Sequence, residues 1–504
     1  MKLGFLCDAA EIDCPAEQRG AEILSIATDS RCVEEGSLFV CIRGFRSDGH
    51  DFIKEALTKG AVAVLVQTDA RLDAIEDTVL LRCDNTRRAT ACLYHAWYGF
   101  PGRNLRMIGV TGTNGKTSVT HMLRRILESV GYRCGLIGTV GCESRGKPMD
   151  CSGADPLANM TTPDPAQMYR MLAQMVEDGV EVVLMEVTSH ALVLEKLAPL
   201  WFEASVFTNL TPEHLDFHKT MEAYADAKAR LFEKSNLSVV NLDSPYAERM
   251  IAAAHGRVIT CSLSKGADYT AEILRNDGDG VAYSLTAENL RQTIRCPIPG
   301  SFSVINSMQA AVTALQLGVS AGRVKEAVAS LSGVRGRMER QPLGTEADFT
   351  VLIDYAHTPD ALENLLRTAA PLCGFGGRLT VVFGCGGDRD RGKRPMMGRV
   401  ASENAQLVIL TSDNSRSEKP DEIISQILVG VRETTPCVVI EDREKAIEYA
   451  IQNARSGDVI LLAGKGHETY EITRDGRRRF DEREIVQKAF ADRKRRKRGE
   501  GTKP

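Results

Sequence analysis

The segment with the most specific chemistry is residues 107–118, Met-Ile-Gly-Val-Thr-Gly-Thr-Asn-Gly-Lys-Thr-Ser. It predicts a buried strand, a glycine-rich loop and a helix with one apolar face. Loop N–H groups and a helix N-terminus bind anions, Lys116 adds a cation, and the Thr117 hydroxyl is a ligand for Mg²⁺. Val110 stands where the strict pattern has a glycine. A turn that merely requires glycine is the alternative, but the pattern favours a nucleoside triphosphate site.

Acidic side chains and histidines follow two further apolar runs. Glu186 ends the run at 181–187, and the carboxyl ends of strands in parallel sheets face the ligand crevice. We therefore expect Glu186 to hold a Mg²⁺ that also touches the triphosphate and Thr117; a strand-end acid paired with a surface lysine is the alternative. The segment 206–218 has two histidines and two acids after another strand, and His214 is a candidate metal ligand or water-holding residue.

A helix is predicted at 221–234, with Tyr224, Lys228 and Phe232 recurring at three- and four-residue spacing. A lysine among apolar neighbours is unusual for a plain surface charge. On spacing alone, however, the pattern favours a lysine whose methylenes pack on the protein while its amine reaches solvent.

Charged residues also follow four strands of the last third of the chain. They lie in the segments 354–359, 384–395, 413–416 and 464–468. Each segment alone is compatible with ordinary loop chemistry. Because the carboxyl ends of successive parallel strands share one crevice, the four together favour a binding site with both signs of charge, which suits a zwitterionic substrate such as an amino acid.

The length of 504 residues suggests roughly three domains at ~150 residues each. We expect an α/β protein with a small N-terminal α/β domain at 1–104, a central parallel-sheet domain with the phosphate loop at 105–336, and a Rossmann-like doubly wound domain at 337–504. A Pro-Gly pair at 101–102 marks the first linker.

Composition excludes several classes of protein. A net charge of −4 gives no reason to expect nucleic acid as the main partner, and no apolar run approaches a membrane span. The N-terminus does not resemble a signal peptide, and 14 scattered cysteines fit reduced thiols in a cytoplasmic protein. The basic run at 493–498 is interpreted as part of a solvated, disordered tail that begins near residue 491; a nucleic-acid or anionic-lipid contact is the alternative.

Taken together, these motifs resemble those of the Mur ligase family across nearly the whole chain. The matching segments are GTNGKTS at 112–118, TTP at 161–163, EVTSHAL at 186–192, NLTPEHLDFH at 209–218, YADAKARLF at 224–232, NSMQAA at 306–311, DYAHTPDAL at 354–362, GCGGDRDRGKRP at 384–395, DNSR at 413–416 and AGKGHE at 463–468. Any one of them is weak, but this many in one order is highly specific.

The resemblance implies an ATP-dependent amide ligase of peptidoglycan precursor synthesis that acts in the cytoplasm, and we expect a monomer. ATP would phosphorylate the terminal carboxylate of UDP-N-acetylmuramoyl-L-alanyl-D-glutamate, and the amine of an incoming amino acid would displace the phosphate. The DNSR segment resembles the DNPR of members that add meso-diaminopimelate, so this is the expected amino acid. An L-lysine-adding member of the family, a ligase like folylpolyglutamate synthetase and a non-enzymatic P-loop switch are the alternatives.

The resemblance also implies roles for individual residues. One Mg²⁺ would lie on Thr117 and Glu186, and a second on His214 and on Lys228 carried as a carbamate. The expected ATP-binding residues are Gly112, Thr113, Asn114, Gly115, Lys116, Thr117, Ser118, Asn306, Arg337, Asp354 and His357. The expected catalytic residues are Lys116, Glu186, His214 and Lys228.

The two remaining substrates are assigned in the same way. Contacts to the uridine-linked sugar-peptide match Ser30, Thr161, Thr162, Thr188 and Lys196, and contacts to the amino acid match Arg389, Asp413, Asn414, Ser415, Arg416, Gly464 and Glu468. There are departures from the family pattern. Lys196 replaces the usual arginine, which removes a bidentate anion contact, and Ser415 replaces the proline that stiffens the turn.

Overall fold

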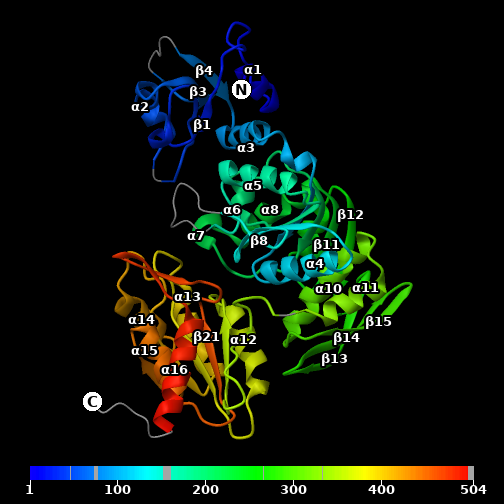
Figure 1. The fold of residues 1–504 in the computed structure, drawn as a ribbon, viewed down its shortest axis with the longest axis vertical. Coiled ribbons are helices and arrows are strands. Elements are labelled where there is room, and N and C mark those ends of the chain that lie inside the picture. Colours follow the sequence, from blue (N-terminus) through cyan, green and yellow to red (C-terminus); the bar gives the residue numbers. More distant parts are fainter. Residues whose placement is uncertain (46, 73–77, 151–159, 265, 332, 498–504) are drawn as a thin grey trace.

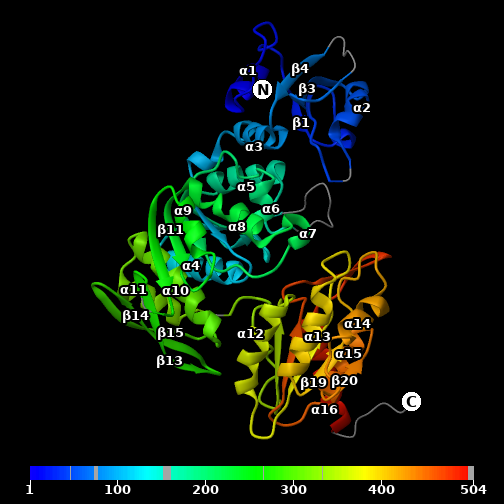
Figure 2. The same cartoon turned by 180° about the vertical axis from the view of Figure 1, so that it is seen from behind.

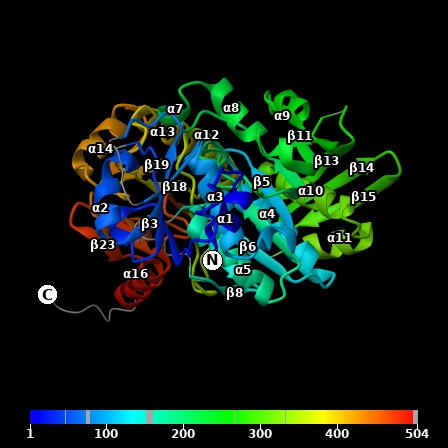
Figure 3. The same ribbon diagram turned by 90° about the horizontal axis from the view of Figure 1, so that it is seen from above.

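The computed structural model describes residues 1–45, 47–72, 78–150, 160–264, 266–331 and 333–497. Three large sheets follow one another along the described chain, with a two-stranded antiparallel sheet near the C-terminus, and the sections that contain the large sheets are arranged along the long axis of the molecule (Figures 1 and 2). Viewed down that axis, the N-terminal section lies over the other two, with the C-terminal section on one side (Figure 3). The α/β class with parallel-dominated sheets is confirmed, while the domain boundaries at 104 and 336 stay predictions.

The N-terminal section contains a parallel sheet of four strands in the order β1-β2-β3-β4. Its core is formed by apolar side chains of β2 and β3, such as Leu38, Val40 and Leu65, packed against helices. The elements are α1 (Leu3–Ala9), β1 (Ser25–Ala27), β2 (Ser37–Val40), α2 (Ile53–Thr58), β3 (Ala61–Gln67), β4 (Val79–Cys83) and α3 (Thr86–Trp97).

The central section contains eleven strands in the order β15-β14-β13-β12-β11-β10-β5-β9-β6-β7-β8. The strands from β13 to β6 are parallel, and helices pack on both faces. Antiparallel ribbons extend both ends, which the sequence interpretation did not anticipate. The strands are β5 (Arg106–Thr111), β6 (Cys134–Gly138), β7 (Gly141–Ser144), β8 (Lys147–Pro148), β9 (Val182–Glu186), β10 (Phe202–Phe207), β11 (Ser235–Asn241), β12 (Arg257–Ser262), β13 (Tyr269–Asp277), β14 (Gly280–Ala287) and β15 (Leu290–Cys296).

The helices of the central section cover this sheet from both sides, with α4, α10 and α11 packed together. The helix predicted at 221–234 is shorter, because α8 ends at Ala229 and a 3-10 turn at Phe232–Lys234 leads into β11. The helices are α4 (Lys116–Ser129), α5 (Pro165–Glu177), α6 (Ser189–Val193), α7 (Leu215–His218), α8 (Met221–Ala229), α9 (Ala247–Ala253), α10 (Ser301–Gln316) and α11 (Ala321–Ala329).

The C-terminal section has a six-stranded sheet in the order β16-β17-β21-β18-β19-β20, parallel except for β16. Its helices lie on both faces, as a doubly wound unit requires. The elements are β16 (Glu339–Arg340), β17 (Thr350–Asp354), α12 (Pro359–Ala369), β18 (Leu379–Phe383), α13 (Lys393–Asn404), β19 (Leu407–Leu410), α14 (Pro420–Leu428), β20 (Cys437–Val439), α15 (Arg443–Gln452), β21 (Val459–Ala463), β22 (Tyr470–Thr473), β23 (Gly476–Arg479) and α16 (Glu482–Lys497).

Two predictions from composition can be compared with this fold. In the described ranges, no helix combines the length and apolar character needed to cross a bilayer. The described cysteines are free thiols, and several are buried, as predicted for small core residues. Cys151 lies outside the described residues.

The interpretation of the chain from residue 491 as a disordered tail is wrong for 491–497, which form the last turns of α16. Arg493 is buried, and its guanidinium donates hydrogen bonds to the carbonyls of Ile451, in the last turn of α15, and Ala454, just after that helix. Carbonyls at a helix end lack partners within the helix, so a cation there is stabilising. Composition alone could not show this neighbour. Residues 498–504 lie outside the described residues.

Replacement of Arg493 by alanine is expected to lower the free energy of unfolding by about 1.5–3 kcal/mol, because hydrogen bonds from a charged donor are lost. Thermal unfolding of the purified variant measures this loss. Arg495, whose side chain is 70% exposed, is the matched control, and Arg495→Ala should leave the melting temperature unchanged. Equal melting temperatures for Arg493→Ala and the wild type would contradict the role assigned to Arg493.

Candidate functional site

The phosphate loop connects β5 to α4 and is held in place by close neighbours. Gly112 and Gly115 have φ angles of +149° and +87°, in the range that favours glycine. A Cβ atom at Gly112 would lie 1.8 Å from Thr208 Oγ1, and one at Gly115 would lie 2.6 Å from Asn306 Oδ1. Both positions therefore require glycine, and the loop backbone is free to approach a phosphate closely.

The loop lysine lies over its own loop. Lys116 Nζ donates hydrogen bonds to the carbonyl oxygens of Gly112 (2.9 Å) and Thr113 (2.8 Å). Burial lowers the pKa of Lys116, and the nearby Glu186 carboxylate counteracts part of that shift. An anionic ligand at this position would favour the charged form of the amine.

Glu186 ends β9 and is fully buried beside the loop. Its carboxylate accepts hydrogen bonds from Thr117 Oγ1 (3.0 Å), from the Thr139 backbone N–H (2.9 Å) and from Thr139 Oγ1 (2.9 Å). The motif search missed Thr139, because a single threonine after β6 has no distinctive sequence context. A carboxylate and a hydroxyl side by side are the kind of oxygen ligands that Mg²⁺ takes.

Lys228 lies behind the loop on α8 with only 1% of its surface exposed. Its amine donates to the carbonyl of Gly112 (2.9 Å) and lies 4.6 Å from the centre of the Tyr224 ring. Burial, and then repulsion from Lys116, lower the pKa of Lys228 well below that of a free lysine. The interpretation from spacing alone, an amine that reaches solvent, is therefore wrong, since the amine is packed against the loop instead.

His214 begins α7 in a left-handed conformation with φ of 57°. Its ring lies 4.8 Å from the ring of His190 and 6.2 Å from that of Tyr224, so it is on the same side of the loop as α8. Partial burial lowers the pKa of His214 to about 4, against the opposing effect of Glu213. A neutral imidazole is the form that binds metals. No group of three or more His, Cys, Asp or Glu side chains arranged for a metal occurs in the described ranges, so any ion here would need other ligands.

Residues of the C-terminal section meet the phosphate loop. Arg337 Nη2 lies 3.2 Å from Thr117 Oγ1, and Asn114 Nδ2 donates to Asp360 Oδ2 at 3.0 Å. His357 Nε2 lies 3.2 Å from a carboxylate oxygen of Glu213 in the central section. These contacts close a cavity of about 390 Å³ over the loop.

Most of the sequence-predicted nucleotide residues line this cavity. They are Thr113, Asn114, Gly115, Lys116, Thr117, Ser118, Asn306, Arg337, Asp354 and His357, together with Glu186, His214, Thr161, Thr188 and Arg389. Gly112, at the start of the loop, and Lys228, behind the loop, are not among the lining residues. The Asp354 carboxylate accepts hydrogen bonds from the backbone N–H groups of Met338 (2.7 Å) and Ala356 (2.8 Å). These bonds hold the backbone of the cavity wall in place.

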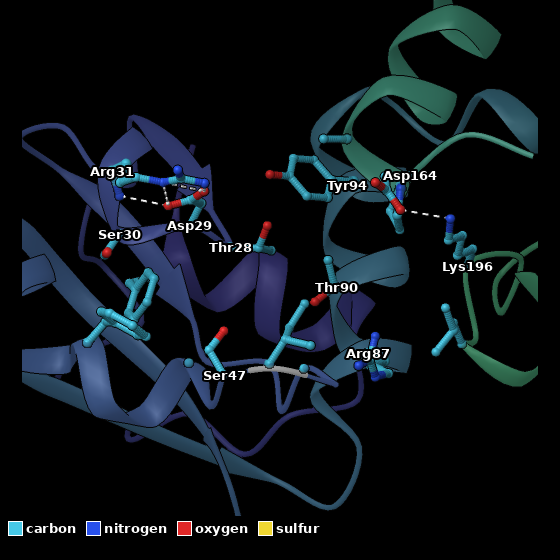
Figure 4. Close-up of a pocket in the computed structure, with 18 of the residues that line it drawn as sticks. Thr28, Asp29, Ser30, Arg31, Ser47, Arg87, Thr90, Tyr94, Asp164 and Lys196 are labelled. Atoms are coloured by element: carbon cyan, nitrogen blue, oxygen red, sulfur yellow. Dashed lines mark hydrogen bonds and ion pairs between the residues drawn. The ribbon is translucent and has the colours of Figure 1, made fainter. Parts of the chain in front are cut away.

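A second cavity of about 680 Å³ lies between the N-terminal section and the central section (Figure 4). It is lined by Ser30 on one side and by Lys196 on the other. Lys196 Nζ forms an ion pair with Asp164 (2.8 Å). Thr161 lines the first cavity and Asp164 lines the second, so the segment 161–164 runs from one to the other. Thr162 is buried between them and its hydroxyl lies 3.1 Å from that of Thr188.

The predicted amino-acid residues come together at the carboxyl ends of β18, β19 and β21. Asn414 Nδ2 donates to Glu468 Oε2 (2.8 Å), and Lys465 Nζ donates to Asn414 Oδ1 (3.0 Å). A Cβ atom at Gly464 would lie 2.5 Å from Asp413 Oδ2. Lys465 is fully buried and was not assigned a role from the sequence, since its motif supplied only Gly464 and Glu468.

Two cations of this site lie close to each other. Arg416 Nη1 donates to the carbonyl of Gly387 (2.8 Å), and Ser415 beside it is buried. Burial, and then repulsion from Arg416, lower the pKa of Arg389, which also lines the cavity over the phosphate loop. An anion bound between two guanidinium groups would relieve their repulsion.

Comparisons with known proteins agree with this geometry. Three family models match: the Mur ligase family catalytic domain over residues 22–94, the Mur ligase middle domain over 110–314 and the Mur ligase glutamate ligase domain over 336–466.

Individual relatives match almost end to end. The chain is 41% identical to UDP-N-acetylmuramoyl-L-alanyl-D-glutamate--2,6-diaminopimelate ligase 1 of Clostridium acetobutylicum, over 96% of this chain and 98% of the relative. It is 42% identical to the corresponding ligase of Caldanaerobacter subterraneus subsp. tengcongensis, over 94% and 95%. A solved structure of a UDP-N-acetylmuramoyl-L-alanyl-D-glutamate--2,6-diaminopimelate ligase is similar with a TM-score of 0.68 and 32% identity, covering 97% of this chain and 99% of that one. The family models and the relatives match nearly the whole chain, and the phosphate loop, the Glu186 carboxylate and the charged strand ends occur together in it. This chain therefore belongs to the Mur ligase family.

Proposed function

We propose that this chain is the ligase that joins meso-diaminopimelate to UDP-N-acetylmuramoyl-L-alanyl-D-glutamate at the expense of ATP, in peptidoglycan precursor synthesis. The observation that carries the proposal is the pair of cations Arg389 and Arg416, which meet beside Gly386. A Cβ atom at Gly386 would lie 2.9 Å from Arg416 Nη1 and 3.8 Å from Arg389 Cγ, and Arg389 also lines the phosphate-loop cavity. This observation stands beside the names of relatives that are 39–42% identical over more than nine tenths of the chain.

The proposed reaction has two steps. A carboxylate oxygen of the nucleotide-linked peptide attacks the γ-phosphorus of ATP, the bond to the β-phosphate oxygen breaks, and ADP leaves an acyl phosphate. The amine of the amino acid then attacks the acyl carbon and loses a proton as phosphate departs, which leaves the amide. A carboxylate alone is unreactive toward amines, so phosphorylation supplies the leaving group.

The first step brings two anions together, and cationic side chains must offset their repulsion. Lys116 and Arg337 line the cavity from opposite sections and are proposed to bind the triphosphate. The loop N–H groups from Gly112 to Ser118 contribute through the N-terminus of α4. We propose that Asn306, Asp354 and His357 complete the ATP site, supported by their places in or beside its wall.

The donor set around the phosphate loop fits Mg²⁺. The Thr117 hydroxyl and the Glu186 carboxylate lie 3.0 Å apart, and we propose that they hold one ion. We propose that His214 and the carbamate of Lys228 hold a second. Bound Mg²⁺ neutralises phosphate charge and so lowers the repulsion between the reacting anions. The remaining ligands would be phosphate oxygens and water, as is usual for this ion.

Replacement of Thr139 by valine is expected to raise the Mg²⁺ concentration for half-maximal activity roughly tenfold, because groups that orient a metal ligand typically matter by 10–100-fold. Valine keeps the shape of threonine but cannot donate to Glu186. Titration of activity with Mg²⁺ measures the change. Thr58→Val, at an exposed threonine of α2, is the control and should match the wild type. An unchanged Mg²⁺ requirement in Thr139→Val would refute the positioning of Glu186 by Thr139.

The nucleotide-linked peptide is proposed to lie across both cavities. Ser30 would contact the uridine end, while Lys196 and the threonines Thr161, Thr162 and Thr188 would contact the sugar-peptide, supported by the continuous path along 161–164. The amino acid is proposed to bind Arg389, Asp413, Asn414, Ser415, Arg416, Gly464 and Glu468. Because the proposed substrates are cytoplasmic metabolites, we propose a cytoplasmic enzyme, and the monomeric state stays a prediction.

A folylpolyglutamate synthetase is an alternative with a similar fold. The folylpolyglutamate synthase of Mycobacterium tuberculosis is similar with a TM-score of 0.61 at 18% identity, which shows the fold alone. The similarity covers 83% of this chain. The cavity of about 680 Å³ beside Ser30 favours the uridine nucleotide.

The test is phosphate release by the full-length chain with ATP, Mg²⁺ and UDP-N-acetylmuramoyl-L-alanyl-D-glutamate, over a panel of amino acids with mass analysis of the products. The proposal expects release that depends on the nucleotide-linked peptide and a product that contains diaminopimelate. A lysine-containing product would indicate the L-lysine-adding alternative. Release with a folate and glutamate instead would indicate the folylpolyglutamate alternative, and no release under any condition would indicate a non-enzymatic P-loop protein.

A further inference from the structure

Arg87 lies at the start of α3 and lines the cavity between the N-terminal and central sections. In the described part of the chain, its guanidinium forms no ion pair; its contacts are a hydrogen bond from Nη2 to the carbonyl of Arg43 (2.6 Å) and the ring of Phe45, 5.8 Å away. That hydrogen bond uses one of five N–H groups of the guanidinium. The Asp164 carboxylate attracts this guanidinium from beyond ion-pair distance and is itself paired with Lys196. A half-buried cation that forms no ion pair is a candidate anion-binding group.

Among the described residues, the other two cations that line this cavity, Arg31 and Lys196, are already in ion pairs. Arg31 makes hydrogen bonds of 2.6–3.1 Å to Asp29, and its side chain is 83% exposed. Lys196 is paired with Asp164 at 2.8 Å. Of the lining cations that the structure describes, Arg87 is therefore the one that can bind an incoming anion without first breaking an ion pair.

The position of Arg87 indicates which part of a ligand it would meet. In Figure 4, Ser30, Asp29 and Arg31 lie on one side of the cavity and Lys196 with Asp164 on the other, while Arg87 lies between these two groups, next to Thr90 and nearer to Lys196. In a uridine diphosphate sugar, the diphosphate likewise lies between the nucleoside and the sugar. The order of groups in the ligand matches the order of side chains along the cavity.

We propose that Arg87 binds the diphosphate of the uridine nucleotide and thereby sets the preference of this cavity for a diphosphate over an uncharged nucleoside. This inference rests on the proposed function and adds a residue that the motif comparison did not include. The contacts to the Arg43 carbonyl and the Phe45 ring would hold the guanidinium plane, so that its remaining N–H groups form a fork toward two phosphate oxygens.

The test is calorimetric titration of the full-length chain with UDP and, separately, with uridine. Four proteins are compared: the wild type, Arg87→Gln, Arg87→Lys and Arg88→Gln. Arg88 is the neighbouring exposed arginine of α3 outside the cavity, so Arg88→Gln makes the same charge change without touching the site. Thermal unfolding checks that each variant is folded.

The wild type should bind UDP more tightly than uridine. Arg87→Gln should weaken UDP binding about 10- to 100-fold, as loss of a charge-assisted contact does, and leave uridine binding unchanged. Arg87→Lys should give an intermediate value, because an ammonium keeps the charge but not the fork. Arg88→Gln should match the wild type.

Three outcomes would overturn the inference. UDP binding in Arg87→Gln could equal that of the wild type, or UDP and uridine could weaken by the same factor, which would show a change of cavity shape. If Arg87→Gln does not fold, Arg87→Lys replaces it in the test. A ratio of UDP affinity to uridine affinity that is the same in Arg87→Lys as in the wild type would then overturn the inference. Failure of the wild type to bind UDP at all would refute the proposed function itself, which separates the two conclusions.

Discussion

Lys228→Ala is expected to reduce nucleotide-dependent phosphate release by at least about 100-fold, the scale seen when a preorganised electrostatic group is removed from an active site. Lys228 is buried against Gly112 with no carboxylate partner in the described residues. Its amine, once neutral, can attack CO₂ and release a proton, which gives a carbamate anion. Alanine removes this anion and leaves space where the side chain was.

The decisive measurement is rescue. Acetate, propionate or bicarbonate should restore part of the activity of Lys228→Ala, because a small carboxylate can occupy the space and replace the carbamate. The same additives should not rescue Lys116→Ala, which lacks a cation and not an anion. Lys325→Ala, at an exposed lysine of α11, controls for loss of a helical lysine and should be fully active. Full activity of Lys228→Ala without additives would remove its proposed role in metal binding.

The second large effect concerns the choice of amino acid. We expect the wild type to prefer meso-diaminopimelate strongly over L-lysine, which differs by one distal carboxylate. That carboxylate would gain a charge-assisted contact with Arg416, worth roughly 1.5–3 kcal/mol. L-Lysine would instead leave Arg416 without an anion and bring an ammonium toward two guanidinium groups, because Arg389 lies close by.

Arg416→Ala should therefore raise the KM for diaminopimelate roughly 10- to 100-fold while the KM values for ATP and the nucleotide-linked peptide change little. Arg416→Lys should recover part of the loss. Arg399→Ala, at an exposed arginine of α13, is the control for the loss of charge. A wild type that prefers lysine, or an unchanged KM for diaminopimelate in Arg416→Ala, would contradict the assignment, and Ser415 would be the first residue to investigate.

The sequence predicted those features that depend on local pattern. The strand predicted at the start of 107–118 is β5, and the apolar run at 181–187 contains β9, because a strand covered on both faces needs apolar residues throughout. The phosphate loop was recognisable because its glycines are required by backbone geometry, as the close approach of Thr208 to Gly112 illustrates.

Features that depend on distant neighbours could not be predicted in this way. Asn114 contacts Asp360, which is 246 residues further along the chain, and nothing in either local segment indicates the other. The burial of Lys228 likewise depends on Gly112, 116 residues before it, so spacing within α8 suggested a surface lysine. Thr139 was missed because it belongs to no distinctive pattern, and Lys465 was missed because only Gly464 and Glu468 of its motif were assigned contacts.

The strand order of the C-terminal sheet has a consequence for synthesis of the chain on the ribosome. β17, which carries Asp354 at its end, pairs with β16 on one side and with β21 at Val459–Ala463 on the other. Its parallel neighbour β21 is thus synthesised long after it, and pairing of such distant segments is slow.

The central section can bury its own core earlier, but the wall of the nucleotide cavity that follows β17 cannot be fixed until β21 is available. ATP can therefore stabilise the nascent chain fully only near the end of translation, so chains that terminate before residue 463 should remain sensitive to proteases even when ATP is abundant.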